Sequence, residues 1–474
     1  MCLRREHSSA VTAMAGSRST LATGMSSACP SIPMTTPGLA MPSRVCSARA
    51  IGEAGCLRRL QVIVIEPDPS QFCSCGCKTV RMGEQIIEKL AHKPAEIYVI
   101  EERYPKYTCR NCDRFVQAQT PDRAIDYSRF DTSLVVAILV AKYADFLPLY
   151  RLEQIFGRSG VQLNRATLGR LTMRAGDVLR PIYDALIADL KSGPKLFADE
   201  TAIPLLVPGL GRTKNCYAWA MCRDDRRWKG NLPPAVTFHF AQSREGKHGE
   251  DFLVGFHGIL QVDAYGGYNR LTRADYPGGP LTLAYCWAHA RRKFWDISQS
   301  TKSVEARKVL EMIGKLYVIE KELKGQPALV RQTVRATRSA PIIDELFRYL
   351  EELSSQILMK SKLGEAISYT LKLRDGLRVL LSDGRVEIDN NPVENTIRPL
   401  ALLRKNALFA GSEFGGEVWA IVCSLLGTCK LNCIEPHAYF TWVFEQVANK
   451  LPRSQYDKLL PWHCPKGRHN GRPP

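Results

Sequence analysis

The sequence predicts an α/β fold: a mixed β-sheet core with a helical insertion, preceded by a small cysteine-bearing unit and a pair of helices. Three observations carry this prediction. Cysteines gather within residues 63–120, helical spacing dominates residues 121–190, and strand-like runs alternate with helical runs from residue 191 to residue 450. A long helical stretch at about 300–385 interrupts the last of these regions.

The totals limit the classes of protein to consider. A chain of 474 residues is long enough for several folding units, and its 45% apolar residues can supply a sizeable core. The net charge of +18 favours a polyanionic partner. No apolar run reaches the roughly 20 residues that span a bilayer, and the N-terminus lacks the apolar core of a secretory signal. We therefore expect a cytoplasmic protein with no membrane partner, whose 16 cysteines are mostly reduced.

Residues 1–62 differ in composition from the rest of the chain. They contain no Phe, Trp or Tyr, and they show neither strand nor helix periodicity. Because such a segment cannot bury enough apolar surface to offset its ordering entropy, we expect it to be disordered, or a non-native extension from a mis-set start or a frameshift. The alternative is a basic arm that contacts nucleic acid through Arg4, Arg5, Arg58 and Arg59.

Residues 63–120 are expected to form a small unit. The segments VIVIEPD and EIYVIEERYPKYTC have the composition and alternation of strands. Two cysteine clusters about 30 residues apart can place four thiolates around a structural zinc ion, although the first cluster is irregular. The alternative is a set of ordinary thiols. The candidate ligands, four of the five at most, are Cys73, Cys75, Cys77, Cys109 and Cys112.

Residues 121–190 read as two helical segments joined by the short break GRSGVQ. Asn164 is a suitable N-cap for the second helix. A helix-turn-helix would place Arg165, Thr167 and Arg170 near the start of a DNA-recognition helix. The alternative is an ordinary helical hairpin with solvated arginines, which is the commoner structure.

Five strand candidates lie between residues 195 and 300. Three come first and resemble a meander: KLFADETAIPLLV, KNCYAWAMCRD and AVTFHFAQSR. A helix over GEDFLVGFHG then precedes a fourth strand in GILQVDAYGGY, which is expected to end at Asp263 with a Gly-Gly turn. The segment LTLAYCWAHARRKFWDI follows as a fifth strand that runs into a basic helix. This order predicts an α/β arrangement with a mixed sheet.

The remaining segments are expected to be mainly helical. Within residues 300–385 a stripe of apolar residues recurs at steps of three and four, which indicates one buried helix face. Its members are Ile343, Leu346, Leu350, Leu353 and Ile357. Residues 386–450 return to mixed structure with helices, and residues 451–474 form a basic tail that we expect to be loose.

Three acidic residues point to metal chemistry. Asp199 and Asp263 are each expected at the end of a strand, and Glu394 is expected at a helix start. Carboxylates suit two Mg²⁺ ions, or Mn²⁺, which activate a nucleophile and stabilise a leaving oxyanion in phosphodiester cleavage. The alternative for Glu394 is a capping box with Asn391, or a surface pair with Arg398.

Basic residues near these acids are candidate phosphate contacts. They follow the motif CWAH or precede a glycine-rich bend, and their alternative role is an ordinary solvated face. The candidates are Arg291, Arg292, Lys293, Arg398, Arg404 and Lys405. His289, in the same CWAH motif, is expected to be structural, because a lone histidine is more often a satisfied core residue than a catalytic base.

Longer motifs resemble the IS66-family transposases, the DDE enzymes of bacterial insertion sequences, from about Val62 to about Pro465. The motifs are KLFADET, QVDAYGGYNRL, YCWAHARRKF, DNNPVENTIRPLALLRKNALFAGSEFGGE and LLPW, with the cysteine unit before them. The resemblance implies an RNase H-like core in which Asp199, Asp263 and Glu394 are the Mg²⁺-binding triad. It also implies a zinc unit, a helix-turn-helix and a helical insertion before the last acid.

Two departures from the family pattern stand out. Phe72 occupies the position of the first cysteine, and residues 1–62 lack the charged, zipper-like segment that usually precedes the zinc unit. The favoured hypothesis is a transposase that cuts insertion-sequence ends and joins them to target DNA, acting as a homo-oligomer at the bacterial nucleoid with accessory proteins of the element. The alternative is a catalytically inactive, transposase-derived DNA-binding protein.

Overall fold

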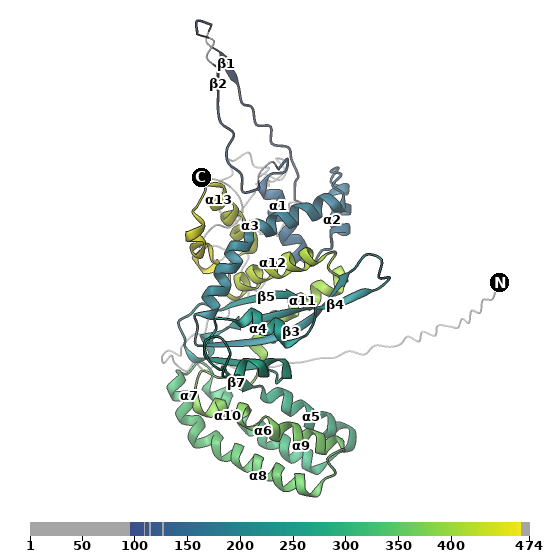
Figure 1. Cartoon of the computed structure of the whole chain (residues 1–474), viewed down its shortest axis with the longest axis vertical. Helices are drawn as coiled ribbons and strands as arrows, with labels where there is room; N and C mark the ends of the chain where they lie inside the picture. Colours follow the sequence, from purple (N-terminus) through teal and green to yellow (C-terminus); the bar gives the residue numbers. More distant parts are fainter. Residues whose placement is uncertain (1–94, 109, 113–114, 126–127, 466–474) are drawn as a thin grey trace, which may run out of the picture. The chain divides into compact units, whose positions relative to one another are not determined.

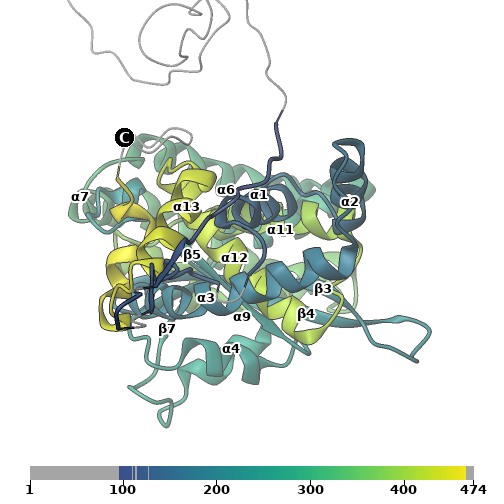
Figure 2. The ribbon, with the colours of Figure 1, turned by 90° about the horizontal axis from the view of Figure 1, so that it is seen from above.

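The computed structural model describes residues 95–108, 110–112, 115–125 and 128–465 (Figures 1 and 2). Apart from Ala95, these all belong to one compact unit, Glu96–Pro474. The predictions for residues 1–62, for the VIVIEPD strand, for Cys73, Cys75, Cys77 and Cys109, and for the last nine residues fall outside this part of the chain.

A five-stranded mixed sheet forms the centre of the described unit, in the order β5-β4-β3-β6-β7. The first three strands along the chain make an antiparallel meander, while β6 and β7 add in parallel to β3. The predicted mixed sheet and all five of its strands are therefore confirmed. The strands are β3 Lys195–Leu206, β4 Thr213–Arg223, β5 Ala235–Ala241, β6 Ile259–Val262 and β7 Thr282–Tyr285.

Helix α12 (Glu413–Leu431) packs against β5 and against the long helix α3 (Arg165–Lys191). Ser424 Oγ accepts a hydrogen bond from Phe238 N at 2.8 Å, so the helix satisfies a backbone donor of the edge strand. A Cβ at position 416 would lie 2.6 Å from the Phe240 ring, so glycine permits this close approach. By length and composition α12 could cross a membrane, but 67% of its apolar window is buried inside the protein, as in a core helix.

Helices α5 to α10 pack around a second apolar core on the β7 side of the sheet (Figure 1). Four members of the predicted apolar stripe are buried in this core, and Ile357 caps the end of α8 half-buried. The helices are α5 Trp287–Thr301, α6 Val304–Leu323, α7 Ala328–Val334, α8 Ala340–Gln356, α9 Lys362–Lys372 and α10 Arg374–Ser382.

The rest of the described chain is helical except for one short strand pair. Strand β1 (Lys106–Thr108) pairs with β2 (Phe115–Gln117), but residues 95–105 form no strand, so the predicted strand over EIYVIEERYPKYTC is wrong except at its end. Tyr98 and Val99 are exposed there, and alternation without a partner strand does not make a sheet. The remaining α-helices are α1 Thr132–Leu139, α2 Leu149–Arg158, α4 Gly246–Leu253, α11 Asn391–Ala407 and α13 Pro436–Ala448. Short 3₁₀ segments cover Asp225–Trp228, Gly266–Thr272, Arg453–Leu459 and Pro461–His463, and short π-helical segments cover Val140–Ala144 and Arg335–Ser339.

Candidate metal and nucleic-acid site

Asp199 lies inside β3 and not at its end as expected, and Asp263 is the first residue after the neighbouring parallel strand β6. Phe197 of β3 pairs with Gln261 of β6, and each aspartate follows two residues later in the chain. Because side chains alternate with a period of two and adjacent strands lie about 4.8 Å apart, this register favours one face of the sheet for both carboxylates, and the charge of Asp263 acts on Asp199. The fold thus brings together two acids separated by more than sixty positions in the sequence.

Asp199 lies among other acidic side chains. Burial first, and then the charges of Glu200, Asp263 and Glu394, together raise the pKa of Asp199 to about 7, against the lowering by the backbone hydrogen bond from Glu200. One oxygen of Asp199 accepts that bond at 2.8 Å, and one oxygen of Asp263 accepts a bond from Tyr265 N at 2.9 Å. A divalent cation would relieve the repulsion at the oxygens that remain.

Glu394 projects from the first turn of α11, whose start is fixed to the sheet. Asn390 donates a hydrogen bond through Nδ2 to Ala198 O at 3.0 Å, next to Asp199. The alternative role of Glu394, a capping box with Asn391, is wrong, because the N-cap is Asn390, it makes no side-chain capping bond, and Glu394 is the fourth residue of the helix. No ion pair joins Glu394 to Arg398, two residues that the structure describes fully.

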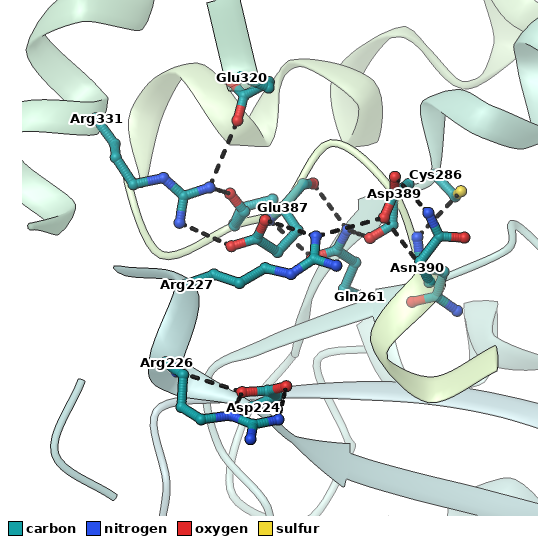
Figure 3. A network of polar contacts seen from close by, with 12 residues as sticks. Asp224, Arg226, Arg227, Gln261, Cys286, Glu320, Arg331, Glu387, Asp389 and Asn390 are labelled. Atoms are coloured by element: carbon teal, nitrogen blue, oxygen red, sulfur yellow. Dashed lines mark hydrogen bonds and ion pairs between the residues drawn. The ribbon is translucent and has the colours of Figure 1, made fainter. Parts of the chain in front are cut away.

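Gln261 ties strand β6 to the segment that leads into α11 (Figure 3). Its buried side chain donates to Glu387 O at 2.8 Å and to Asp389 O at 3.0 Å, and it accepts from Glu387 N at 3.0 Å. Because Gln261 lies two residues before Asp263, one amide couples the strand that carries Asp263 to the segment that places Glu394.

A buried ion network holds the same segment from the side of the helical insertion (Figure 3). Arg331 of α7 pairs with Glu387 at 2.7 Å and also contacts Glu320 of α6 at 3.5 Å, while Arg227 contacts Glu387 at 3.4 Å. Burial alone would raise the pKa of Glu387, but the charges of Arg331, Lys195 and Arg227 hold it below its usual range. The segment before α11 is therefore anchored on both sides.

His289, expected to be structural, lies beside Cys286 and Glu394. Among the described residues, Cys286, His289 and Glu394 are the one group of three potential ligands whose ligand atoms all lie within 4.8 Å of one another. The His289 Nδ1 atom is buried and has no hydrogen-bond partner in the described part of the chain. Burial raises the pKa of Cys286 to about 12, so its thiol stays protonated near neutral pH. The spacing C-x-x-H at a helix start was the available signal.

The carboxylate oxygens of Asp199, Asp263 and Glu394 do not all lie within 4.8 Å of one another in the described structure. Two cations about 4 Å apart would not require it, because each cation takes a different subset of the acids. Glu200, directly after Asp199, has protein partners of its own: Arg244 pairs with it at 2.6 Å and Tyr268 donates to it at 3.0 Å. Sequence reasoning did not single out either partner.

The predicted phosphate contacts lie on two of the elements that build the site. Arg292 and Lys293 are exposed on α5, and Arg291 is half-buried beside them. On α11, Lys405 and Arg398 are exposed, whereas Arg404 is half-buried. The Arg404 guanidinium donates to Ala202 O at 2.6 Å and so connects α11 to β3.

The predicted helix pair is present in the N-terminal part of the unit. The Asn164 N-cap is confirmed by its 2.8 Å bond from Thr167 N. Arg165 pairs with Glu153 at 3.3 Å, and Arg170 donates to Thr167 at 3.2 Å, all on exposed surface. The geometry of α2 and α3 leaves these side chains available to solvent, and their contact with DNA stays a prediction.

The chain is basic, and its centre is a mixed β-sheet. Acidic residues of β3, of the end of β6 and of α11 interact electrostatically. The family models place it more closely: the chain belongs to the IS66 transposase family, whose model matches residues 127–418. The IS66 C-terminal element matches residues 424–462, and the zinc-finger binding domain of transposase IS66 matches residues 70–113, which supports a zinc site there.

Related proteins of Sinorhizobium fredii are themselves described as uncharacterized. The protein y4jD is 42% identical over 405 residues, which cover 85% of this chain and 79% of the relative. The protein y4qI is 40% identical over 415 residues, covering 87% and 77% respectively. The protein y4hP is 32% identical over 412 residues, covering 84% and 74%.

Proposed function

We propose that this protein is a DDE transposase that cuts DNA at insertion-sequence ends and transfers the ends into target DNA. The observation that carries the proposal is the register match of Asp199 and Asp263, together with the charge of Glu394 that reaches Asp199. The strand order, an antiparallel meander extended by two parallel strands, supports an RNase H-like core. Family membership supplies the general transposase role.

The donor set fits Mg²⁺ or Mn²⁺. Asp199, Asp263 and Glu394 offer hard carboxylate oxygens, and the raised pKa of Asp199 reports negative charge that the protein itself leaves uncompensated. When bound, two such ions supply Lewis-acid activation of the attacking oxygen and stabilisation of the leaving oxygen. Asp199 and Asp263 would bind at the shared position, and Glu394 would complete the second site.

The chain's own residues hold this arrangement and meet the DNA. Gln261 and Asn390 fix the two backbone segments that present Asp263 and Glu394. The exposed Arg292 and Lys293 would contact the phosphates beside the site. Water attacks at the element end first, and the released 3′-hydroxyl then attacks the target phosphodiester in the same site.

Other regions would select the DNA and assemble the complex. A structural zinc ion held by four of the five N-terminal cysteines, and the helices α2 and α3 with Arg165, Thr167 and Arg170, would bind the terminal inverted repeats. Cleavage of two ends favours a homo-oligomer, with accessory proteins of the same element as further partners. We place this activity in the bacterial cytoplasm, at the nucleoid.

The test measures DNA binding and cleavage separately on one substrate, a duplex that carries the element's end. Asp263→Asn should abolish Mg²⁺-dependent cleavage and strand transfer, by a factor of 10³ or more on the order expected for a lost metal ligand, while binding persists. Asp251→Asn, an exposed aspartate on α4, is the charge-matched control and should retain both. Unchanged strand transfer in Asp263→Asn would refute the proposal.

The same assay decides the second candidate, a DNA-binding protein without catalytic activity. The replacement of the first knuckle cysteine by Phe72 favours this reading. Binding of the element's end by the unmodified protein, with no cleavage in Mg²⁺ or Mn²⁺, would establish it.

A further inference from the structure

A pocket of about 530 Å³ opens between helix α5, helix α6 and the start of α11. This volume lies within the range of about 300–1,000 Å³ that is typical of small-ligand sites. Its lining includes two arginines, two aromatic side chains, a carboxylate and an amide: Arg291, Arg292, Trp295, Tyr317, Asp389 and Asn391. The assigned roles in metal binding and cleavage do not use Trp295, Tyr317 or Asn391.

The pocket adjoins the candidate metal site. Asn391 begins α11 and lies three residues before Glu394. Tyr317 lines the same pocket as Asp389 and Asn391, and its pKa is raised by burial first and also by the charges of Asp389 and Glu394. The pocket and Glu394 therefore share the first turn of α11.

An exposed indole makes one wall of the pocket. Trp295 is 46% exposed although it is among the largest apolar side chains, and the Arg291 guanidinium lies 5.7 Å from its ring centroid. Neither Arg291 nor Arg292 forms an ion pair with any residue that the structure describes. A flat aromatic face beside two uncommitted cations is suited to a base and its phosphates.

The side chain of Asn391, which also lines the pocket, offers a hydrogen-bond acceptor. Asn391 donates through Nδ2 to Asp389 at 2.7 Å, which fixes the amide plane, and its Oδ1 accepts no bond from the described residues. A fixed amide with a free acceptor matches the donor-bearing edge of a nucleobase. A Cβ at Gly314 would meet nothing within 4 Å, so the space above α6 at this point is open rather than filled by packing.

We propose that this pocket binds an unpaired nucleobase of the DNA strand adjoining the scissile phosphate. The base stacks on Trp295, its flanking phosphates contact Arg291 and Arg292, and Asn391 reads its edge. The inference rests on the proposed function for the identity of the polymer as DNA. It extends that function, because it assigns a base-binding role to residues outside the metal ligands and holds the strand end in register with Glu394.

The test compares binding of two duplexes with the element's end, one blunt and one carrying a three-nucleotide 3′ overhang, in the absence of divalent metal. Stacking of one base predicts that the unmodified protein binds the overhang about 5- to 100-fold more tightly. An overhang of abasic nucleotides retains the phosphates and should lose this preference. Crosslinking from 5-iodouracil in the overhang should map to Trp295.

Two variants separate the pocket from the surrounding basic surface. Trp295→Ala removes the stacking face, and Gly314→Leu fills the open space without a backbone clash, so each should abolish the overhang preference while blunt-duplex affinity is kept. Val318→Ala, at a 60% exposed position on α6, is the matched control and should keep the preference. Retention of the preference in both pocket variants, or for the abasic overhang, would overturn the inference.

This outcome is independent of the cleavage assay. Because the binding test contains no divalent metal, a protein that proves unable to cut DNA can still show the overhang preference. Conversely, loss of the pocket would leave the effect of Asp263→Asn on cleavage unchanged.

Discussion

At the scale of single residues, Asp199 determines how the site responds to pH. Its pKa of about 7 lies above the ordinary value of a carboxyl group, because burial and neighbouring acids disfavour the charged form. At a pH between the ordinary pKa and the raised pKa, the Asp199 carboxyl binds more protons in the folded protein than in the unfolded chain. The contribution of Asp199 to the free energy of unfolding is therefore greatest below the ordinary pKa and is lost as pH rises through about 7.

We predict that Asp199→Asn stabilises the metal-free protein at pH 8, by on the order of 1–2 kcal/mol or a few degrees in Tm, and has little effect at pH 4. The asparagine keeps the shape of the side chain and removes the charge. Thermal unfolding at several pH values checks this, with Asp251→Asn as the control. Added Mg²⁺ should stabilise the unmodified protein at pH 8 and not the variant. A variant less stable than its parent at pH 8 would contradict this view of the charge.

Single residues were predictable from the sequence only where the local pattern carried the signal. Asp199 and Asp263 follow apolar strand runs, so their positions on the sheet could be anticipated. Gln261 looks ordinary in the sequence, because its hydrogen-bond partners lie more than a hundred positions away. The Glu394 capping box was wrong because its N-terminus is held by tertiary bonds rather than by a local cap.

At the scale of elements, the helical insertion holds the segment that positions Glu394. Arg331 of α7 reaches Glu387 in the buried network, and Tyr369 of α9 donates to Asp263 O at 3.4 Å. The insertion therefore contacts the strand end and the loop that together present the last two acids. Its stability and the geometry of the site are coupled.

We predict that Glu387→Gln lowers the free energy of unfolding by about 3–5 kcal/mol, because the buried Arg331 loses its 2.7 Å charged partner and keeps only the 3.5 Å contact with Glu320. The double variant Arg331→Met/Glu387→Gln should be less destabilised than the sum of the two single changes. Denaturant unfolding of the four proteins measures this coupling. Arg348→Met, which removes an exposed pair with Glu352, is the control and should cost about 1 kcal/mol or less. Additive effects in the double variant would contradict the assigned pairing.

Whole elements were easier to predict than their connections. The strands of the sheet and the apolar stripe of α8 follow from periodicity, which depends only on which face is buried. The strand order depends on long-range pairing, and residues 95–105 show the limit of alternation, because a strand needs a partner that the local sequence does not specify.

At the scale of the whole molecule, charge is distributed in two opposing ways. The net charge of +18 attracts a polyanion to the protein, while the proposed site gathers the acidic residues Asp199, Asp263 and Glu394. A phosphodiester can approach such a cluster only with cations between them. This arrangement requires three segments, distant in the sequence, to meet at one place.

The most direct test of this convergence is cleavage of the protein backbone by Fe²⁺ bound in place of Mg²⁺, with ascorbate and peroxide as reagents. Radicals formed at the ion cut the nearest peptide segments, which mass spectrometry identifies. We predict cuts near residues 199, 263 and 394 together, suppressed by excess Mg²⁺ and by Asp263→Asn. Cuts confined to Cys286, His289 and Glu394, with none near Asp199 or Asp263, would contradict a metal site shared by the three acids.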